Sequence, residues 1–306
     1  MTYNELRQAI CFYKYRCPHF FGFIRADALR WNVVLNGYRS IKNINRVADL
    51  SKTKYSARVF ESLDRADKDG LHIEYLFVDN NTDEASKVLL GDFGRRNNNV
   101  KTIPGKQLNK YQCTEVSHYW NNELMNTVGE YKDRIIEYAI KNEFDYIFLI
   151  DSDLLINKRL IKHLLTCDKD IVSEIFWAKW KPQSASLPNV WLYDQYTLVP
   201  SQQSENLSES DKALRRLMFL IELQIPGLYK VGGLGACTLI SRAALVKGVR
   251  FKQIENLRIL KGEDRFFCVR AAALGLELSV DTHYPAYHIY RESDLEGVPE
   301  YIAKNE

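Results

Sequence analysis

Residues 144–153 read FDYIFLIDSD, and this stretch decides the predicted fold. The apolar run from Tyr146 to Ile150 is rich in aromatic and β-branched side chains, as buried parallel strands are. Asp151 and Asp153 follow at the carboxyl end of that strand, where open α/β sheets bind their ligands. Two carboxylates two residues apart can share a hard cation such as Mn²⁺ or Mg²⁺. The stretch therefore predicts a strand that ends in a metal site.

The same carboxylates also allow a purely structural interpretation. Asp and Ser often cap the helix that follows a strand, and residues 154–165 are a possible helix after Asp153. A motif of three residues does not by itself separate a helix cap from a metal ligand. The choice depends on which other residues the fold brings to this strand end.

Length, charge and cysteine pattern set broad limits. The 306 residues suffice for one large α/β domain or two small ones, and the formal net charge of +3 gives no reason to expect a nucleic-acid partner. No apolar run approaches the ~18–20 residues of a transmembrane segment, and the N-terminus lacks a signal-peptide pattern, so a cytoplasmic protein is expected. The cysteines contain no CxxC pair, which predicts free thiols and neither a zinc site nor a disulfide framework. They are Cys11, Cys17, Cys113, Cys167, Cys237 and Cys268.

Helix and strand signals alternate along most of the chain. Residues 55–66 are amphipathic at helical spacing, 73–80 read as a buried strand, and helices are expected over 82–93 and 123–141. This order predicts an α/β fold with a doubly wound, mostly parallel sheet flanked by helices.

The second half continues the alternation, whereas the first 54 residues are hard to assign. Strands are expected in DIVSEIFW and LELSVD, a strand and a helix in GACTLISRAALV, and a helix in EDRFFCVRAAALG; residues 181–210 read as a long polar loop. We divide the chain into an N-terminal segment, 1–54, of uncertain placement and packed on the main domain, and that domain, 55–306.

Two histidines close to the last predicted strand are candidates for a third metal ligand. A neutral imidazole binds Mn²⁺ well beside carboxylates, so His288 is the first choice to join Asp153 and His283 the second. The alternative is that these rings only pack among the aromatic side chains around them.

Glu263 and Asp264 stand at the start of a predicted helix. Acidic residues are favoured at helix N-termini for electrostatic reasons alone. A carboxylate at such a position can also act as the general base that removes a proton from a hydroxyl group.

Aromatic and basic side chains offer further contacts. Trp177 and Trp180 can stack on sugar faces or simply fill the core. Lys132 and Arg291 can neutralise a diphosphate or remain solvated surface charges.

Taken in order, several motifs resemble the nucleotide-sugar-dependent glycosyltransferases of the GT-A fold, in particular bacterial family 2-like and Anp1-like members. The resemblance covers about residues 55–295. The motifs that carry it are EYLFVDNNTDEAS, FDYIFLIDSD, DIVSEIFWAKW, VGGLGACTLISR, GEDRFFCVRAAALG and YPAYHIYRESD.

The resemblance implies roles for the residues at the first strand ends. Asp79 would meet the nucleotide base or ribose. Asp151, Ser152 and Asp153 would form the DxD motif, with Asp153 on the metal and Asp151 nearer the ribose or a metal-bound water. His288 looks like the late metal ligand of similar enzymes.

It also implies roles later in the chain. Asp264 resembles the catalytic base of inverting members, with Glu263 beside it, and the backbone at Gly232 and Gly233 would lie close to the donor sugar. One departure is that the short strand candidate NVVLNG is separated from Tyr55 by the polar stretch YRSIKNINRVADLSKTK.

These observations predict a Mn²⁺- or Mg²⁺-dependent transfer of a sugar from a nucleotide diphosphate sugar to a glycan, protein or small-molecule acceptor, with inversion. The alternatives are a haloacid-dehalogenase-like phosphatase, a nucleotidyltransferase, and a degenerate transferase that only binds a nucleotide sugar. The sequence carries no signal for the oligomeric state.

Overall fold

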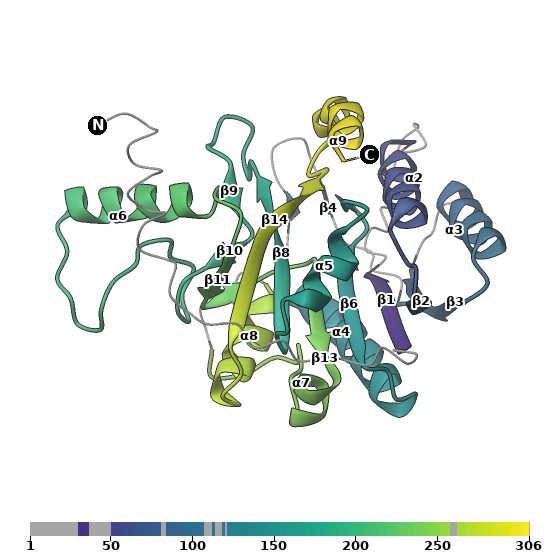
Figure 1. The fold of residues 1–306 in the computed structure, drawn as a ribbon, viewed down its shortest axis with the longest axis horizontal. Coiled ribbons are helices and arrows are strands. Elements are labelled where there is room, and N and C mark those ends of the chain that lie inside the picture. Colours follow the sequence, from purple (N-terminus) through teal and green to yellow (C-terminus); the bar gives the residue numbers. More distant parts are fainter. Residues whose placement is uncertain are drawn as a thin grey trace.

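Strand β6 (Tyr146–Asp151), the predicted strand of the FDYIFLIDSD stretch, lies inside a large sheet in the computed structural model (Figure 1). The structure describes residues 30–36, 50–80, 84–106, 112–113, 118–119, 121–257 and 262–305. Within these ranges, helices lie on both faces of the sheet, which confirms the predicted α/β class.

The main sheet has one dominant strand direction. Its order is β11 (Leu228–Val231), β14 (Leu278–His288), β8 (Ile171–Ala178), β13 (Thr238–Ser241), β6, β1 (Arg30–Asn36), β2 (His72–Asp79) and β3 (Val100–Pro104). In the described part of the chain, β13 and β11 run against the other six strands of this path, so the sheet is mostly parallel as predicted.

Short strands complete the edges of this arrangement. Strand β7 (Leu154–Leu155) pairs with β14, and β9 (Leu187–Pro188) pairs with β8. Two small separate ladders join β10 (Val190–Trp191) to β12 (Gly233–Leu234) and β4 (Gln112–Cys113) to β5 (His118–Tyr119).

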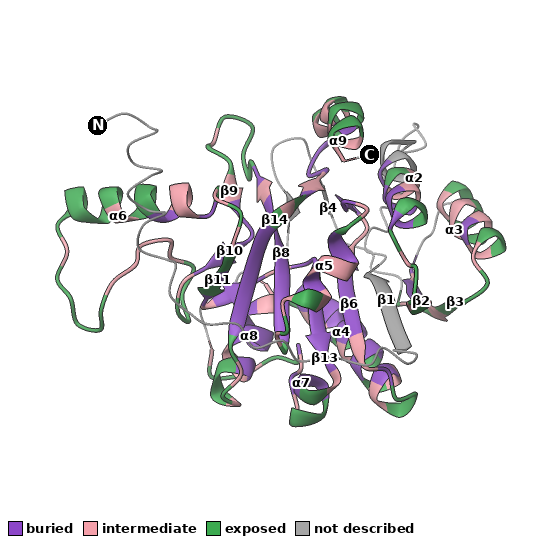
Figure 2. Cartoon of the chain, in the orientation of Figure 1, coloured by how far each residue is buried: buried purple, intermediate pink, exposed green. Residues whose placement is uncertain are grey.

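Alternation along β6 divides the interior into two layers. Ile147 and Leu149 pack into one apolar cluster, whereas Phe148 and Ile150 pack into the other, as the period of two in a strand requires. The first cluster contains side chains from α4 (Asn122–Lys141), α6 (Glu209–Glu222), α7 (Arg242–Lys247) and α8 (Asp264–Ala273). The second contains side chains from α2 (Leu50–Arg65), α3 (Glu84–Arg96), α5 (Leu160–Thr166) and α9 (Val298–Lys304), the last preceded by the 3-10 turn η1 (Glu292–Gly297). The strands between these layers are the most buried part of the chain (Figure 2).

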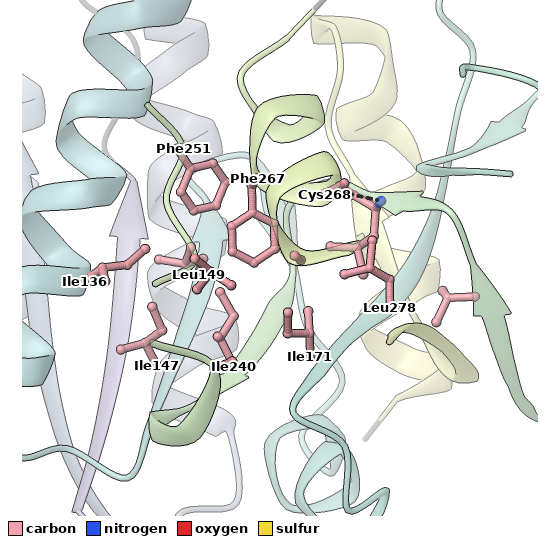
Figure 3. Close-up of a cluster of buried hydrophobic side chains, with 14 of the residues drawn as sticks. Ile136, Ile147, Leu149, Ile171, Ile240, Phe251, Phe267, Cys268 and Leu278 are labelled. Atoms are coloured by element: carbon pink, nitrogen blue, oxygen red, sulfur yellow. Dashed lines mark hydrogen bonds between the residues drawn. The ribbon is translucent and has the colours of Figure 1, made fainter. Parts of the chain in front are cut away.

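The core beside β6 fixes the start of α8. Phe267 of α8 stacks on Phe251, with ring centroids 4.5 Å apart, above Leu149 (Figure 3). Burying each such side chain stabilises the fold by about 1.5–3 kcal/mol. The backbone N–H of Leu234 also donates to the Cys268 sulfur at 3.4 Å. Both contacts hold the first turn of α8 against the sheet.

The N-terminal segment contributes a strand to the main sheet. Strand β1 contains residues 32–36 of the NVVLNG candidate and runs parallel to both β2 and β6, so this part of segment 1–54 belongs to the sheet. Helix α2 begins at Leu50, ahead of the predicted start at residue 55. Residues 37–49, most of the unusual polar stretch, lie outside the described residues.

Two later elements differ from the prediction. Strand β14 continues to His288 and not only to Asp281, because its far end pairs with the short strand β7, which has no sequence signal of its own. The polar segment 181–210 contains β9 and β10 and is not a plain loop. None of the helices in the described ranges combines the length and the apolar character needed to cross a bilayer.

Candidate active site at the carboxyl ends of the strands

The register of the central strands brings the predicted site residues to one edge. Asn36 at the end of β1 pairs with Asp151 at the end of β6, and β2 ends at Asp79 on the other side of β1. Asp79 is half-buried, and its backbone C=O accepts from Gly105 N–H at 2.8 Å. The carboxylates of Asp79 and Asp151 therefore emerge from the same edge of the sheet, as the strand order predicts.

Asp153 and His288 are brought together by the pairing of β7 with β14. His288 pairs with Leu154, and Ile289 N–H donates to the backbone C=O of Asp153 at 2.8 Å. The two side chains are buried, and Nε2 of His288 lies 3.5 Å from Oδ2 of Asp153. The helix-cap interpretation of Asp153 is wrong, because the next residues form a strand and α5 begins only at Leu160.

The surroundings of His288 suit a metal ligand. Its Nδ1 is fully enclosed and has no hydrogen-bond partner among the described residues. The ring packs edge-on against Phe176, with centroids 4.9 Å apart, and lies 6.3 Å from the ring of Trp180. A separation of 3.5 Å allows one cation with bonds of about 2.2 Å to contact both imidazole and carboxylate. This set of nitrogen and oxygen donors fits Mn²⁺, and Asp151 lies two residues from it.

Lys132 joins the second pair of acidic residues to this edge. The Lys132 ammonium group, on α4, donates to Glu263 Oε1 at 2.7 Å and to Asp264 Oδ1 at 2.8 Å. It also lies 4.8 Å from the centre of the Phe251 ring. Lys132 and Glu263 are buried, whereas the Asp264 side chain keeps 27% of its surface exposed. Asp264 is therefore the accessible carboxylate of the pair, and Lys132 holds it in place.

Asp151 and Asp264 face a common small cavity. Its wall is made of residues from α4, β6, β12, β13, α8 and the segments before β13 and after α7: Lys132, Leu149, Asp151, Leu234, Gly235, Ala236, Thr238, Phe251, Asp264 and Phe267. The structure thus brings together the DxD stretch at 151–153, the glycine-rich loop at 232–235 and the acidic pair at 263–264, which are well separated along the chain. Proximity of this kind is what separates a site from isolated motifs.

The charges in this cavity shift one another. Burial raises the pKa of Asp151 to about 7, while Lys132 acts in the opposite direction and Asp153 adds to the rise. Burial likewise raises the pKa of Glu263, again opposed by Lys132. Burial alone would lower the pKa of Lys132, but the charges of Asp264 and Glu263 outweigh it and raise that pKa. A divalent cation beside Asp151 would favour its ionised form.

The glycines of the predicted donor loop have a structural reason for lacking side chains. A Cβ on Gly232 would lie 1.9 Å from the backbone nitrogen of Tyr193, and one on Gly233 would lie 1.8 Å from the ring of Trp191. The space beside both glycines is thus occupied by this chain itself. Their contact with a donor sugar stays a prediction.

Three other predicted site residues have contacts of their own. Arg291 is buried, donates to the backbone C=O of Lys179 at 2.7 Å and stacks on Tyr290, so its guanidinium group is engaged within the protein. Trp177 packs against the core, whereas Trp180 is 41% exposed beside His288. Of the two tryptophans, Trp180 is the one placed to meet a ligand.

Of the remaining predicted residues, Ser152 lies at this edge of the sheet and His283 lies beside Asp281. Ser152 is half-buried in the turn between Asp151 and Asp153. His283, the second choice for a metal ligand, lies against Asp281, 2.9 Å from its Oδ2, and is not paired with Asp153.

Two residues of the edge belong to motifs chosen from the sequence but have no individual role predicted there. Gly235 is adjacent to Asp264, since a Cβ there would lie 3.5 Å from Asp264 Oδ2. Asn80, after β2, is buried, and its Oδ1 has no hydrogen-bond partner in the described part of the chain. The only signal for either was its place in a motif next to a residue already chosen.

No family model matches the chain, and no curated protein sequence matches it either. The chain is similar in structure to TarS of S. aureus, with 15% identity, 91% of this chain and 40% of TarS covered, and a TM-score of 0.47. It is also similar to GalNAc-T7, solved with UDP, GalNAc and Mn²⁺, with 13% identity, coverage of 85% and 43%, and a TM-score of 0.48. A third similar structure is the mannosyltransferase PcManGT from Pyrobaculum calidifontis in complex with GDP-Man and Mn²⁺, with 10% identity, coverage of 84% and 56%, and a TM-score of 0.46.

The chain thus spans between 40% and 56% of the length of these three proteins. At such identities and scores, the function has to be argued from the site itself.

Proposed function

We propose that the chain is a metal-dependent glycosyltransferase of the GT-A type, which moves a sugar from a nucleotide diphosphate sugar to an acceptor hydroxyl group with inversion. The observation that carries this proposal is the convergence of two acidic constellations on one sheet edge. Asp151 and Asp264 line one cavity, and Asp153 is paired with His288 two residues from Asp151.

Asp153 and His288, with Asp151 beside them, would hold Mn²⁺ or Mg²⁺. When bound, such a cation neutralises the negative charge of the leaving diphosphate. The aromatic rings of Phe176 and Trp180 beside His288 limit the orientations of the imidazole. A ligand ring that is already oriented loses little conformational freedom on binding.

Asp264 serves as the general base in this proposal. As the acceptor oxygen attacks the anomeric carbon, its proton passes to Asp264 and the bond to the diphosphate oxygen breaks. Lys132 fixes the position of the Asp264 carboxylate through its 2.8 Å hydrogen bond. Because this lysine is committed to the two carboxylates, we assign it a positioning role in place of the diphosphate contact predicted from the sequence.

The donor and acceptor contacts follow from the same edge. Asp79 and Asn80 at the end of β2 are proposed to meet the nucleoside, since β2 flanks β1 on the side away from the metal ligands. The exposed indole of Trp180 is proposed to stack on a sugar ring of the acceptor.

The test is hydrolysis and transfer measured with a panel of UDP-, GDP- and dTDP-sugars, with Mn²⁺ and with EDTA. Asp153→Asn should lower the rate by at least about 10³-fold, because it removes a charged metal ligand. Asp69→Asn, a change of the same kind on an exposed residue, should leave the rate unchanged.

Two results would overturn the proposal. One is that these donors bind but none is hydrolysed or transferred with Mn²⁺ present, which would favour a degenerate transferase that only binds a nucleotide sugar. The other is a phosphoaspartate trapped on Asp151, which would favour the phosphatase alternative.

A further inference from the structure

A second cluster of polar side chains lies inside the fold, away from the strand ends. His163 and Cys167 lie at the C-terminal end of α5, Glu174 is in β8, and Asp281 and His283 are in β14. The parallel strands β8 and β14 pair Glu174 with Asp281. In β8, Glu174 lies two residues from both Val172 and Phe176, which pack in the apolar cluster that contains α5. Side chains two residues apart in a strand point to the same face, so the Glu174 side chain lies on the α5 face of the sheet.

This cluster is separate from the candidate active site. Phe176 lies two residues after Glu174 in β8 and pairs with Ala286, and His288 lies two residues after Ala286 in β14. At the usual rise of about 3.3 Å per residue, these four steps separate the Glu174–Asp281 pair from His288 by roughly 13 Å. The register of β14 shifts between Asp281 and Ala286, and His283 belongs to this irregular stretch. Bulges of this kind often redirect side chains next to functional sites.

Three side chains of the cluster have the spacing of metal ligands. Nε2 of His163 lies 3.0 Å from Oδ1 of Asp281, and Sγ of Cys167 lies 3.8 Å from Oδ2 of the same carboxylate. The three ligand atoms all lie within 4.8 Å of one another. Around a tetrahedral zinc ion with bonds of about 2.0–2.3 Å, ligand atoms are separated by about 3.3–3.8 Å. Small side-chain movements would bring this set into that geometry.

Hydrogen bonds join most polar groups of the cluster, but two enclosed atoms lack one. Nε2 of His163 is enclosed and has no hydrogen-bond partner in the described residues, although it lies so close to Asp281. Oε2 of the fully buried Glu174 is also enclosed and has no hydrogen-bond partner in the described residues. Buried polar atoms without partners are costly, and unexplained ones often mark an ion.

The other contacts of Asp281 resemble the support of a metal ligand. The backbone N–H of His283 donates to Oδ1 at 2.9 Å, and Nδ1 of His283 lies 2.9 Å from Oδ2. Carboxylates that bind metal ions in proteins are usually hydrogen-bonded to further protein groups in this way. Asp281 is 1% exposed, and neither it nor Glu174 forms an ion pair with lysine or arginine among the described residues.

We propose that His163, Cys167 and Asp281 bind a zinc ion, with Glu174 adjacent to its fourth position. Thiolate, imidazole and carboxylate together favour Zn²⁺ over Mn²⁺ or Mg²⁺, which prefer oxygen donors. On binding, the Cys167 thiol loses its proton to solvent, and the charges of Zn²⁺, one thiolate and one carboxylate sum to zero. The site ties α5 to β14, two elements far apart in the sequence, and stabilises the fold.

The cysteine pattern predicts no zinc site because these ligands do not form a CxxC pair or any short motif. His163 and Cys167 are one helical turn apart, but Asp281 joins them only through the sheet. The partial exposure of the histidines, 23% for the His163 side chain and 39% for His283, gives an ion access to the cluster.

The test is titration of the reduced, metal-stripped protein with Co²⁺, which takes the place of zinc and reports a thiolate ligand through a near-ultraviolet charge-transfer band. One equivalent should produce this band together with the visible bands of tetrahedral cobalt, and Zn²⁺ should remove both. The band should survive in Asp153→Asn, because the candidate active site offers no thiolate.

Matched cysteine variants locate the ligand. Cys167→Ser should lose the band, whereas Cys268→Ser, at a buried cysteine outside the cluster, should keep it. His163→Gln keeps the thiolate and should weaken Co²⁺ binding at least tenfold, which covers the case that Cys167→Ser fails to fold. Absence of the band in the parent protein, or its persistence in folded Cys167→Ser, would overturn the proposal.

Discussion

Two carboxylate clusters lie in the described part of the chain, one at the end of β6 and one between β8 and β14, and their charge is compensated in different ways. At the end of β6, the Lys132 ammonium group lies within 2.8 Å of both Glu263 and Asp264. Between β8 and β14, the described residues place only imidazoles in ion-pair contact with Asp281 and no cation on Glu174. A buried charge needs a partner or must be neutralised. The first cluster carries its own cation, whereas the second depends on a proton or a bound metal ion.

Removal of the built-in cation should have the largest effect on stability. Lys132→Met leaves two partly or fully buried carboxylates without their partner, which should lower the free energy of unfolding by about 3–5 kcal/mol. Urea denaturation followed by circular dichroism measures this difference. The matched variant Lys106→Met breaks an exposed pair with Glu130 and should cost less than about 1 kcal/mol. Equal losses would show that Lys132 does not compensate buried charge.

The stability of the metal-free protein should depend on pH because no basic side chain among the described residues forms an ion pair with Glu174 in the second cluster. Burial and then the charge of Asp281 raise the pKa of Glu174 to about 10, from an ordinary value of 4.5. Between these values the unfolded chain releases the proton and the folded chain keeps it, so the stability of the metal-free protein falls as pH rises, by at most about 1.4 kcal/mol per pH unit. Glu174→Gln removes this loss, and its advantage over the parent protein should grow from pH 6 to pH 8.

Thermal unfolding of the metal-free proteins at several pH values checks this prediction. Glu277→Gln is the control, because Glu277 is an exposed residue paired with Lys169 and Lys230. A stability difference between parent and Glu174→Gln that does not change with pH would contradict the comparison.

A smaller effect is expected when the cation is kept but its shape is changed. Lys132→Arg retains the charge but introduces a larger planar group beside Phe251, so it should cost about 1–3 kcal/mol through overpacking. The measurement is the same urea titration. If arginine costs as much as methionine, the fit of the ammonium group and not its charge determines the stability of this cluster.

The two clusters also differ in how far they could be predicted. The residues of the candidate active site stand beside clear local signals: an apolar strand before Asp151, a helix start at Asp264, and an aromatic stretch around His288. A parallel sheet collects such strand ends at one edge, so their convergence could be expected from the order of elements. Their roles in metal binding and catalysis stay predictions.

The second cluster has no comparable signal. The sequence predicts His283 as a second-choice ligand near Asp153 or as a packed ring, whereas its Nδ1 lies 2.9 Å from Asp281 Oδ2. Lys132 was expected to meet a phosphate, yet its ammonium group lies between two carboxylates. Gly232 and Gly233 lack side chains because Tyr193 and Trp191 lie against them. The contacts of Lys132, Gly232 and Gly233 depend on neighbours distant in the sequence.

The sequence by itself determined the α/β class, the strand before Asp151, and the acidic and imidazole side chains available at its end, because hydrophobic periodicity and strand order are local properties of the chain. Only the tertiary structure decided which groups are partners: Asp153 with His288, Lys132 with Glu263 and Asp264, and Asp281 with His163 and Cys167. Pairing depends on strand register and on the packing of helices across the sheet, which bring together side chains that no short motif contains.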